Sequence, residues 1–306
     1  MPEPKVHSSA TDGTVTDRSS KRPGLYLVAT PIGNLGDITL RALEILRRAD
    51  MVACEDTRHT GRLLSAHGIN AKTTSYHDHN APRVRPILLA RLAAGETVAL
   101  VSDAGTPLIS DPGYRLVAEA AAAGIPVYPI PGASSVLAAL CVAGLPTDRF
   151  LFLGFAPSRA AARGKFLQPF ATVDATLVIL ESPKRLAVAL TAMAEIFGDR
   201  PAAICREMTK LHEEIVRGAL GDLAQRYAAA PTPKGEVVIV IAPPEAGAMA
   251  KKFTAAEIDA LLRARLADEK PGDAAAHVAA ETGIARRTLY SRAVALKKSG
   301  DATTDN

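Results

Sequence analysis

Two spacings of apolar residues alternate along the first half of the chain. Short β-branched runs predict buried strands, and longer stretches with an apolar residue every three or four positions predict helices. The strands are expected at 25–30, 51–54, 72–75, 97–102 and 126–130, and the helices at 38–49, 57–67, 83–94, 113–123 and from 133 onward. Strands that alternate with helices in this way predict a mostly parallel α/β sheet.

A second α/β unit begins near Phe150, after a Gly-Leu-Pro-Thr-Asp connector at 144–148. Its strands are expected at 149–155, 175–181, 202–206, 213–218 and 236–242, with helices at 183–197 and 220–229 and a polar stretch at 156–164. Only a short loop separates the strands at 202–206 and 213–218, which indicates antiparallel neighbours in a mixed sheet. Two different sheets imply a cleft between them.

Both ends of the chain depart from this pattern. Residues 1–23 are rich in Ser, Thr, Asp, Lys and Pro and predict a disordered tail. Residues 243–247 have the composition of a linker, and helices are expected beyond it at 253–266, 272–281 and 285–298. We therefore predict a tail at 1–23, α/β domains at 24–147 and 148–244, and a small helical module at 250–300.

Composition excludes several classes of protein. The chain has 306 residues, 48% of them hydrophobic, which is enough for a large core. Its three cysteines lie far apart, so neither a disulfide framework nor a metal site is expected. No apolar run reaches the roughly 18 residues of a membrane span, and no signal peptide is evident, so we expect a cytoplasmic protein. The net charge of +4 permits a nucleic-acid partner without requiring one.

The last predicted helix is basic. It has no acidic residue between Ile284 and Lys298, and it contains one tyrosine, Tyr290, among Arg286, Arg287, Arg292, Lys297 and Lys298. Two interpretations stay open, a solvated basic face and a helix that contacts nucleic-acid phosphates. The second gains from Gly283-Ile284, which resembles the turn of a helix-turn-helix.

Four loops follow predicted strands of the first domain, at 31–36, 55–59, 103–107 and 131–135. Ligands of open α/β sheets bind at the carboxyl ends of strands. None of the loops carries the dinucleotide fingerprint, which argues against a nicotinamide oxidoreductase, and none carries the lysine of a phosphate loop, which argues against a triphosphate ligand. They are rich in Gly, Pro, Ser and Asp, which suits a ligand with hydroxyls, an amine and an adenine. The alternative is structural: tight turns, with Ser134 and Ser135 as helix caps.

Several strings carry a family resemblance. They are Thr30-Pro-Ile-Gly-Asn34-Leu-Gly-Asp37, Ala53-Cys-Glu-Asp-Thr-Arg58, Val101-Ser-Asp-Ala-Gly-Thr-Pro107 with Asp111-Pro-Gly113, Pro131-Gly-Ala-Ser-Ser135, Glu181-Ser-Pro-Lys-Arg185, Cys205-Arg-Glu-Met-Thr-Lys210 and Pro233-Lys-Gly-Glu236. Over residues 24–245 the chain resembles the tetrapyrrole-methylase superfamily and, within it, bacterial enzymes that methylate the ribose 2′-hydroxyl of a cytidine in 16S ribosomal RNA. Met208 replaces a more usual leucine, a volume-conserving change.

The resemblance implies a fold of two α/β domains with S-adenosyl-L-methionine in the cleft between them. It further implies a homodimer that acts on 16S ribosomal RNA of the decoding centre, within the small subunit. The cofactor-binding residues would be Pro31, Ile32, Gly33, Asn34, Asp103, Ala104, Gly105, Thr106, Pro107, Ala133, Ser134 and Ser135.

Methylation of a hydroxyl also needs a group near the acceptor that receives or polarises its proton. The catalytic candidates are Glu55, Asp56, Arg58, Glu207 and Lys210. Arg58, Lys184 and Arg185 suit RNA phosphates and are the substrate-binding candidates. Two alternatives stay open, a tetrapyrrole or diphthamide-type methyltransferase of the same superfamily and a non-catalytic RNA-binding assembly factor. The residues leave open which nucleotide is modified and which group accepts the proton.

Overall fold

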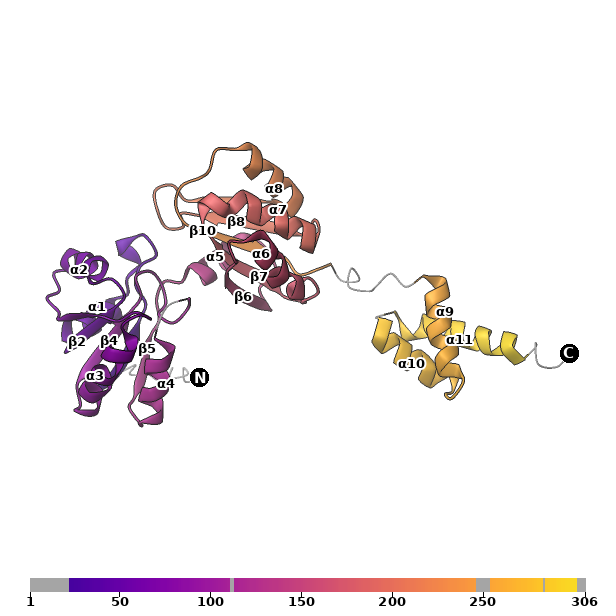
Figure 1. Cartoon of the computed structure of the whole chain (residues 1–306), viewed down its shortest axis with the longest axis horizontal. Helices are drawn as coiled ribbons and strands as arrows, with labels where there is room; N and C mark the ends of the chain where they lie inside the picture. Colours follow the sequence, from indigo (N-terminus) through magenta and orange to yellow (C-terminus); the bar gives the residue numbers. More distant parts are fainter. Residues whose placement is uncertain (1–21, 111–112, 246–253, 283, 302–306) are drawn as a thin grey trace, which may run out of the picture. The chain divides into compact units, whose positions relative to one another are not determined.

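The computed structural model describes residues 22–110, 113–245, 254–282 and 284–301 (Figure 1). The predicted tail at 1–23 lies almost entirely outside the described residues. The chain divides into two compact units. The first unit is Met1–Ala138 with Met208–Leu211, and the second unit is Ala139–Glu207 with His212–Asn306.

The sheet of the first unit has five parallel strands in the order β3-β2-β4-β1-β5. The strands are β1 (Gly24–Val28), β2 (Met51–Cys54), β3 (Thr73–Ser75), β4 (Thr97–Val101) and β5 (Val127–Ile130). The prediction of a parallel α/β sheet is confirmed. Because all strands run the same way, the loops that follow β1, β2 and β4 lie at one edge of the sheet.

Helices cover both faces of this sheet (Figure 1). They are α1 (Leu40–Arg48), α2 (Thr57–Ala66), α3 (Ala81–Ala93) and α4 (Tyr114–Ala122), and α5 (Ser135–Ala143) follows β5. Side chains of β1 alternate between the faces, since Val28 packs with Leu46 of α1 and Leu25 packs with Leu88 of α3. Helix α1 begins two residues later than predicted, because the Thr39 side chain caps it.

The sheet of the second unit is mixed, in the order β6-β7-β10-β8-β9. Its strands are β6 (Phe150–Phe155), β7 (Thr176–Glu181), β8 (Pro201–Arg206), β9 (Glu214–Ala219) and β10 (Val237–Ile241). Only β6 and β7 pair in parallel, and β8 and β9 are antiparallel neighbours, as predicted.

Three helices accompany this sheet, α6 (Ala160–Leu167), α7 (Leu186–Phe197) and α8 (Leu220–Ala229). Helix α6 begins inside the stretch that the sequence analysis described only as polar. Three consecutive alanines favour the helix, Leu167 is fully buried, and the largely buried Arg163 donates a hydrogen bond to the Ser158 carbonyl.

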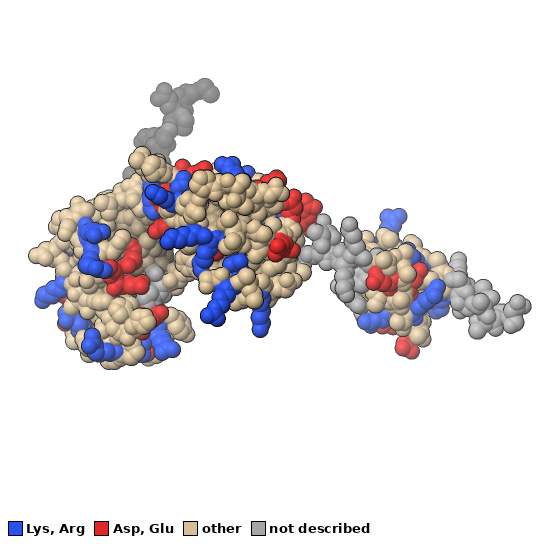
Figure 2. Space-filling view, turned by 45° about the horizontal axis from the view of Figure 1, so that its top comes forward, with Lys and Arg blue, Asp and Glu red and all other residues tan. Residues whose placement is uncertain are grey.

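A C-terminal module consists of α9 (Ala255–Leu266), α10 (Pro271–Thr282) and α11 (Arg286–Asp301), close to the predicted helices. It has its own small core around Leu262, Val278 and Leu289. Figure 2 shows both acidic and basic side chains on the visible face of this module. Gly283, the predicted turn residue, lies outside the described residues. In the described parts of the chain, no helix has both the length and the apolar character that crossing a bilayer requires.

Candidate active site

The loops that follow β1 and β4 are joined by backbone hydrogen bonds. The Thr30 N–H donates to the Gly105 carbonyl at 2.9 Å, and the Gly105 N–H donates to the Thr30 carbonyl at 3.1 Å. The buried Thr30 hydroxyl donates to the Ser102 carbonyl at 2.9 Å. Two of the three predicted cofactor loops therefore lie side by side.

The third loop, after β5, meets the same place. The Thr106 hydroxyl donates to the Ala133 carbonyl at 3.1 Å. A Cβ on Gly105 would lie 3.3 Å from Cγ2 of Ile32 and 3.6 Å from the Ala133 oxygen, and the φ of Gly105 is +83°. A glycine at this point lets the three backbones approach each other closely.

All the predicted cofactor residues lie in the first unit, on these three loops and, for Ser135, at the first position of α5: Pro31, Ile32, Gly33, Asn34, Asp103, Ala104, Gly105, Thr106, Pro107, Ala133, Ser134 and Ser135. The group offers backbone N–H and carbonyl groups, small side chains and one carboxylate, a donor set that fits S-adenosylmethionine. Two side chains also have the structural roles of the alternative interpretation. Asn34 accepts from the Gly36 N–H, and Ser134 accepts from the Leu137 N–H at the start of α5.

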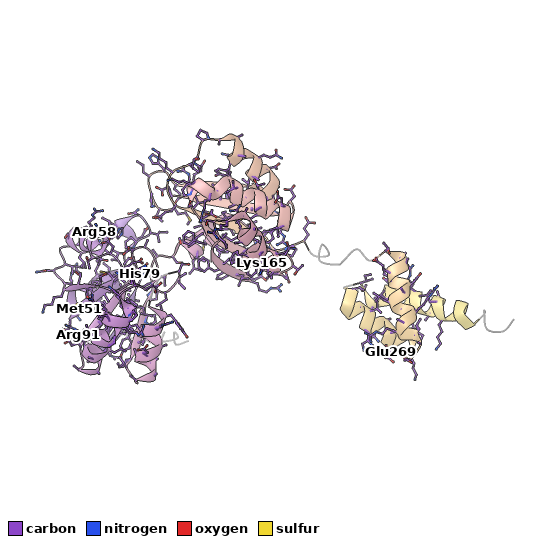
Figure 3. The ribbon with its side chains drawn as sticks, viewed as in Figure 1. Met51, Arg58, His79, Arg91, Lys165 and Glu269 are labelled. Carbon is purple, nitrogen blue, oxygen red and sulfur yellow. The ribbon has the colours of Figure 1, made fainter. Side chains whose placement is uncertain are left out.

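The loop after β2 is attached to this group through Asp103. Its Oδ1 accepts a hydrogen bond from the Asp56 N–H at 3.1 Å. Asp56 in turn caps α2 and pairs with Arg58, whose Nη2 lies 2.9 Å from Asp56 Oδ2. Hydrogen bonds from the Arg58 side chain and N–H lower the pKa of Asp56 to about 2. The Arg58 side chain is highly exposed at the start of α2 (Figure 3).

Glu55, the residue before this cap, lines a cavity of about 400 Å³ in the first unit. Other side chains of its wall, among them Tyr76, Arg85 and Tyr114, were not predicted as site residues. The only feature of the sequence that could have indicated these tyrosines is their position in the chain. Tyr76 directly follows β3, and Tyr114 is the first residue of α4.

Glu207 and Lys210 differ in their surroundings. Glu207 Oε1 accepts from the Glu236 N–H at 3.0 Å, and a Cβ on Gly235 would collide with the Glu207 carboxylate. Its carboxylate thus holds the turn before β10. Lys210 belongs to the first unit, where its side chain lies against the α-carbon of Gly33 in the cofactor loop.

The two basic candidates of the second unit are also unlike each other. Arg185 donates from Nε to Oε1 of Glu181 at 2.8 Å, and this carboxylate is buried. Lys184 is exposed beside it. Because the guanidinium of Arg185 is engaged with a buried carboxylate, Lys184 is the better candidate for a phosphate contact. The described residues contain no group of three or more His, Cys, Asp and Glu side chains that could hold a metal ion.

Two family models match the chain. Residues 24–224, well over half of the 306, match the Tetrapyrrole (Corrin/Porphyrin) Methylases, and residues 254–297 match the RsmI C-terminal HTH domain. A solved structure of similar fold is the uroporphyrin-III C-methyltransferase of Thermus thermophilus in complex with S-adenosylhomocysteine. It is 23% identical, with a TM-score of 0.50 over 71% of this chain and 96% of that chain.

Two curated relatives are much more similar in sequence, and each is named ribosomal RNA small subunit methyltransferase I. The protein of Mesorhizobium japonicum is 54% identical over 90% of this chain and 92% of its own length. The protein of Micromonospora olivasterospora is 44% identical over 94% of this chain and 92% of its own length. The chain therefore belongs to the tetrapyrrole methylase family and, within it, to the small-subunit ribosomal RNA methyltransferases I.

Proposed function

We propose that this enzyme transfers the methyl group of S-adenosylmethionine to the ribose 2′-hydroxyl of a cytidine in 16S ribosomal RNA of the small subunit. The observation that carries the proposal is the meeting of three ligand loops at one edge of the parallel sheet, in a chain 54% identical to a ribosomal RNA methyltransferase. A tetrapyrrole substrate is less well supported, since the likeness to the uroporphyrin enzyme is only 23%.

The three loops would hold the cofactor mainly through backbone groups, with Asp103 bonding its hydroxyls or amine. When bound, S-adenosylmethionine supplies a methyl group that its positive sulfur already activates. The main task of the protein is then alignment of the acceptor, an effect that can contribute up to ~7–11 kcal/mol to the barrier.

The proton of the hydroxyl must also leave, and Glu55 is the carboxylate that we assign to this step. The assignment rests on its position in the wall of the cavity, whereas the Asp56 carboxylate caps α2 and the Glu207 carboxylate holds the turn before β10. A positioned base contributes about 10²–10⁴-fold. Arg58, Lys184 and the basic helix α11 would bind phosphates of the RNA, while Lys210 would position the loop at Gly33.

Two copies would form a dimer, for which the exposed Phe150 and Phe155 of the edge strand β6 offer an apolar surface. The protein would act in the cytoplasm, where its RNA is found. The domain boundaries near residues 147 and 244 stay predictions from the sequence.

Mass spectrometry of 16S RNA from cells with and without the protein tests the substrate, and isothermal titration of the purified full chain tests the cofactor. The expected results are one missing 2′-O-methylcytidine in the deletion strain and stoichiometric binding of S-adenosylmethionine. An unchanged methylation pattern would rule out the RNA substrate, and absence of binding would favour a non-catalytic assembly factor.

A further inference from the structure

The cavity that Glu55 lines contains none of the residues assigned to cofactor binding. We propose that it receives the base of the acceptor nucleotide and selects cytosine over uracil. This inference rests on the proposed function, because it names the part of the RNA that the site recognises. The residues that carry it are Glu55, Tyr76, Asp78, Arg85, Tyr114 and Arg115.

The position of the cavity connects it to the cofactor loops. The loop that contains Asp103 and Pro107 at the cofactor site continues along the chain to Ser110. Ser110 lines the cavity, and so does Gly113. On the other side, the Asp56 N–H that bonds Asp103 directly follows Glu55 in the chain. One continuous stretch and one hydrogen bond therefore place the cavity next to the site of the methyl donor.

The backbone of this stretch is held in an uncommon conformation. Leu108 has a φ of 74° and Ser110 has a φ of 61°, values that residues other than glycine rarely adopt. Gly113 has a φ of +132°, and a Cβ there would lie 2.7 Å from Cδ2 of Leu108. Such strain persists only where the surroundings enforce it, and it is concentrated at ligand sites.

Size and aromatic lining fit one nucleotide base with its ribose. The volume of about 400 Å³ lies within the usual range of small-molecule pockets. Tyr76 is buried, and its burial raises the pKa of its hydroxyl. Tyr114 is 75% exposed at the start of α4. An exposed aromatic ring beside a cavity is a stacking surface for an unpaired RNA base.

The polar lining has both signs of charge. Glu55 and Asp78 offer carboxylate oxygens, and Arg85 and Arg115 offer guanidinium donors. The side chain of Arg85 is 15% exposed, and its Nε lies 2.8 Å from Oε1 of Glu119, which fixes its place in the wall.

Cytosine presents an exocyclic amine that donates and ring N3 and O2 atoms that accept. Carboxylates accept hydrogen bonds from that amine, and arginines donate to the ring acceptors. Uracil has an oxygen in place of the amine, so the same carboxylate would face a second acceptor. A site that hydrogen-bonds a polar group of its substrate discriminates against a ligand that lacks this group, and the lining therefore favours cytosine.

Two variants of the full chain test this assignment, Asp78→Asn and Arg115→Ala. The substrates are small subunits assembled on transcribed 16S RNA with either cytidine or uridine at the modified position. We expect each variant to raise KM for the cytidine substrate at least tenfold, with the affinity for S-adenosylmethionine unchanged within twofold. Asp78→Asn should also reduce the ratio of kcat/KM for the cytidine substrate to kcat/KM for the uridine substrate at least tenfold. Exposed controls outside the cavity wall are Glu195→Gln and Arg47→Ala.

Tyr114→Trp supplies a readout that does not require catalysis, because the chain contains no tryptophan of its own. A short RNA with the target cytidine should quench the fluorescence of this tryptophan. The same RNA with uridine should require an at least tenfold higher RNA concentration for equal quenching. Unchanged KM values in both wall variants, or equal quenching by both RNAs, would overturn the proposal. Failure of the wild-type chain to methylate either substrate would instead contradict the proposed function. The fluorescence titration measures RNA binding without methyl transfer, so the two outcomes can be told apart.

Discussion

The carboxylate of Asp103 accepts a hydrogen bond from the backbone N–H of Asp56, although the two residues are 47 positions apart. This bond joins the loop after β4 to the loop after β2 at the same edge of the parallel sheet. It thereby ties the cofactor loops to the segment that contains Glu55, the proposed base. We therefore expect this carboxylate, together with the pairing of β2 and β4, to help place the methyl donor relative to the acceptor.

Two substitutions at Asp103 separate its roles. Asp103→Asn keeps an oxygen that can accept from Asp56, whereas Asp103→Ala loses both the acceptor and the charge. We expect both variants to bind S-adenosylmethionine at least tenfold more weakly in isothermal titration. Only Asp103→Ala should lose about 0.5–1.5 kcal/mol in the free energy of unfolding. Binding of the cofactor by Asp103→Asn at wild-type affinity would show that the charge is not used.

Gly105→Ala should damage both stability and cofactor binding. The left-handed conformation of Gly105 costs an alanine about 1–2 kcal/mol, and the new Cβ would press on Ile32. Gly68→Ala is the matched control, because Gly68 has a φ of +62° and open space around its Cβ position. Urea unfolding should show similar losses for both variants. Titration with S-adenosylmethionine should show weaker binding for Gly105→Ala alone, and equal binding by the two variants would contradict a cofactor site at the three loops.

Much of this arrangement was predictable because it follows from chain order. Parallel strands end at one edge of a sheet, so loops that follow them must lie near each other. The apolar runs at 25–30 and 97–102 therefore predicted the sheet and the shared edge of the loops that follow them. The strand order that places Thr30 beside Gly105 was not predicted.

Contacts between individual side chains were not predictable. The pairing of Arg85 with Glu119 and of Arg185 with the buried Glu181 depends on the geometry of two elements at once. From the sequence, Arg185 and Lys184 are consequently equivalent candidates, and the cavity that Tyr76 lines is not predicted. Helix α6 was missed because its alanine and arginine residues carry no clear apolar stripe.

The capping role of Asp56 predicts a pH dependence of stability. Hydrogen bonds from Arg58 lower the pKa of Asp56 from an ordinary value of 3.8 to about 2. A lowered pKa in the folded state stabilises the fold above the unfolded value, and this contribution is lost as the pH falls through about 2. Thermal unfolding of Asp56→Ala should therefore give a lower Tm than wild type above pH 5, with the difference shrinking toward pH 2. A difference that stays constant over this range would contradict the role of the charge.

Glu55→Gln should separate binding from catalysis. The substitution keeps the shape of the side chain but removes its ability to accept a proton. Affinity for S-adenosylmethionine should stay within twofold of wild type, while tritiated methyl transfer to small subunits should fall by about 10²–10⁴-fold. Glu195→Gln on the exposed face of α7 is the control and should retain full activity. Full activity in Glu55→Gln would exclude it as the base.

The basic helix α11 should contribute to RNA affinity through only some of its charges. Arg292 bonds Asp259 of α9, with Nε 2.5 Å from Oδ1, and Arg286 donates to the Gly272 carbonyl. Both of these side chains therefore serve the packing of the module. Arg287 and Lys297 are exposed, and they share one side of the helix with the half-exposed Tyr290.

The double variant Arg287→Ala/Lys297→Ala should thus weaken binding of small-subunit RNA and reduce its salt dependence. Each lost phosphate contact lowers the slope of log K against log salt by roughly 0.7–0.9, so the double variant should lose about 1.4–1.8. Arg263→Ala, at an exposed position of α9, is the control and should keep the slope. Arg292→Ala should instead lower the melting temperature of the module, since it breaks the ion pair with Asp259. A slope unchanged in the double variant would leave α11 as a merely solvated basic surface.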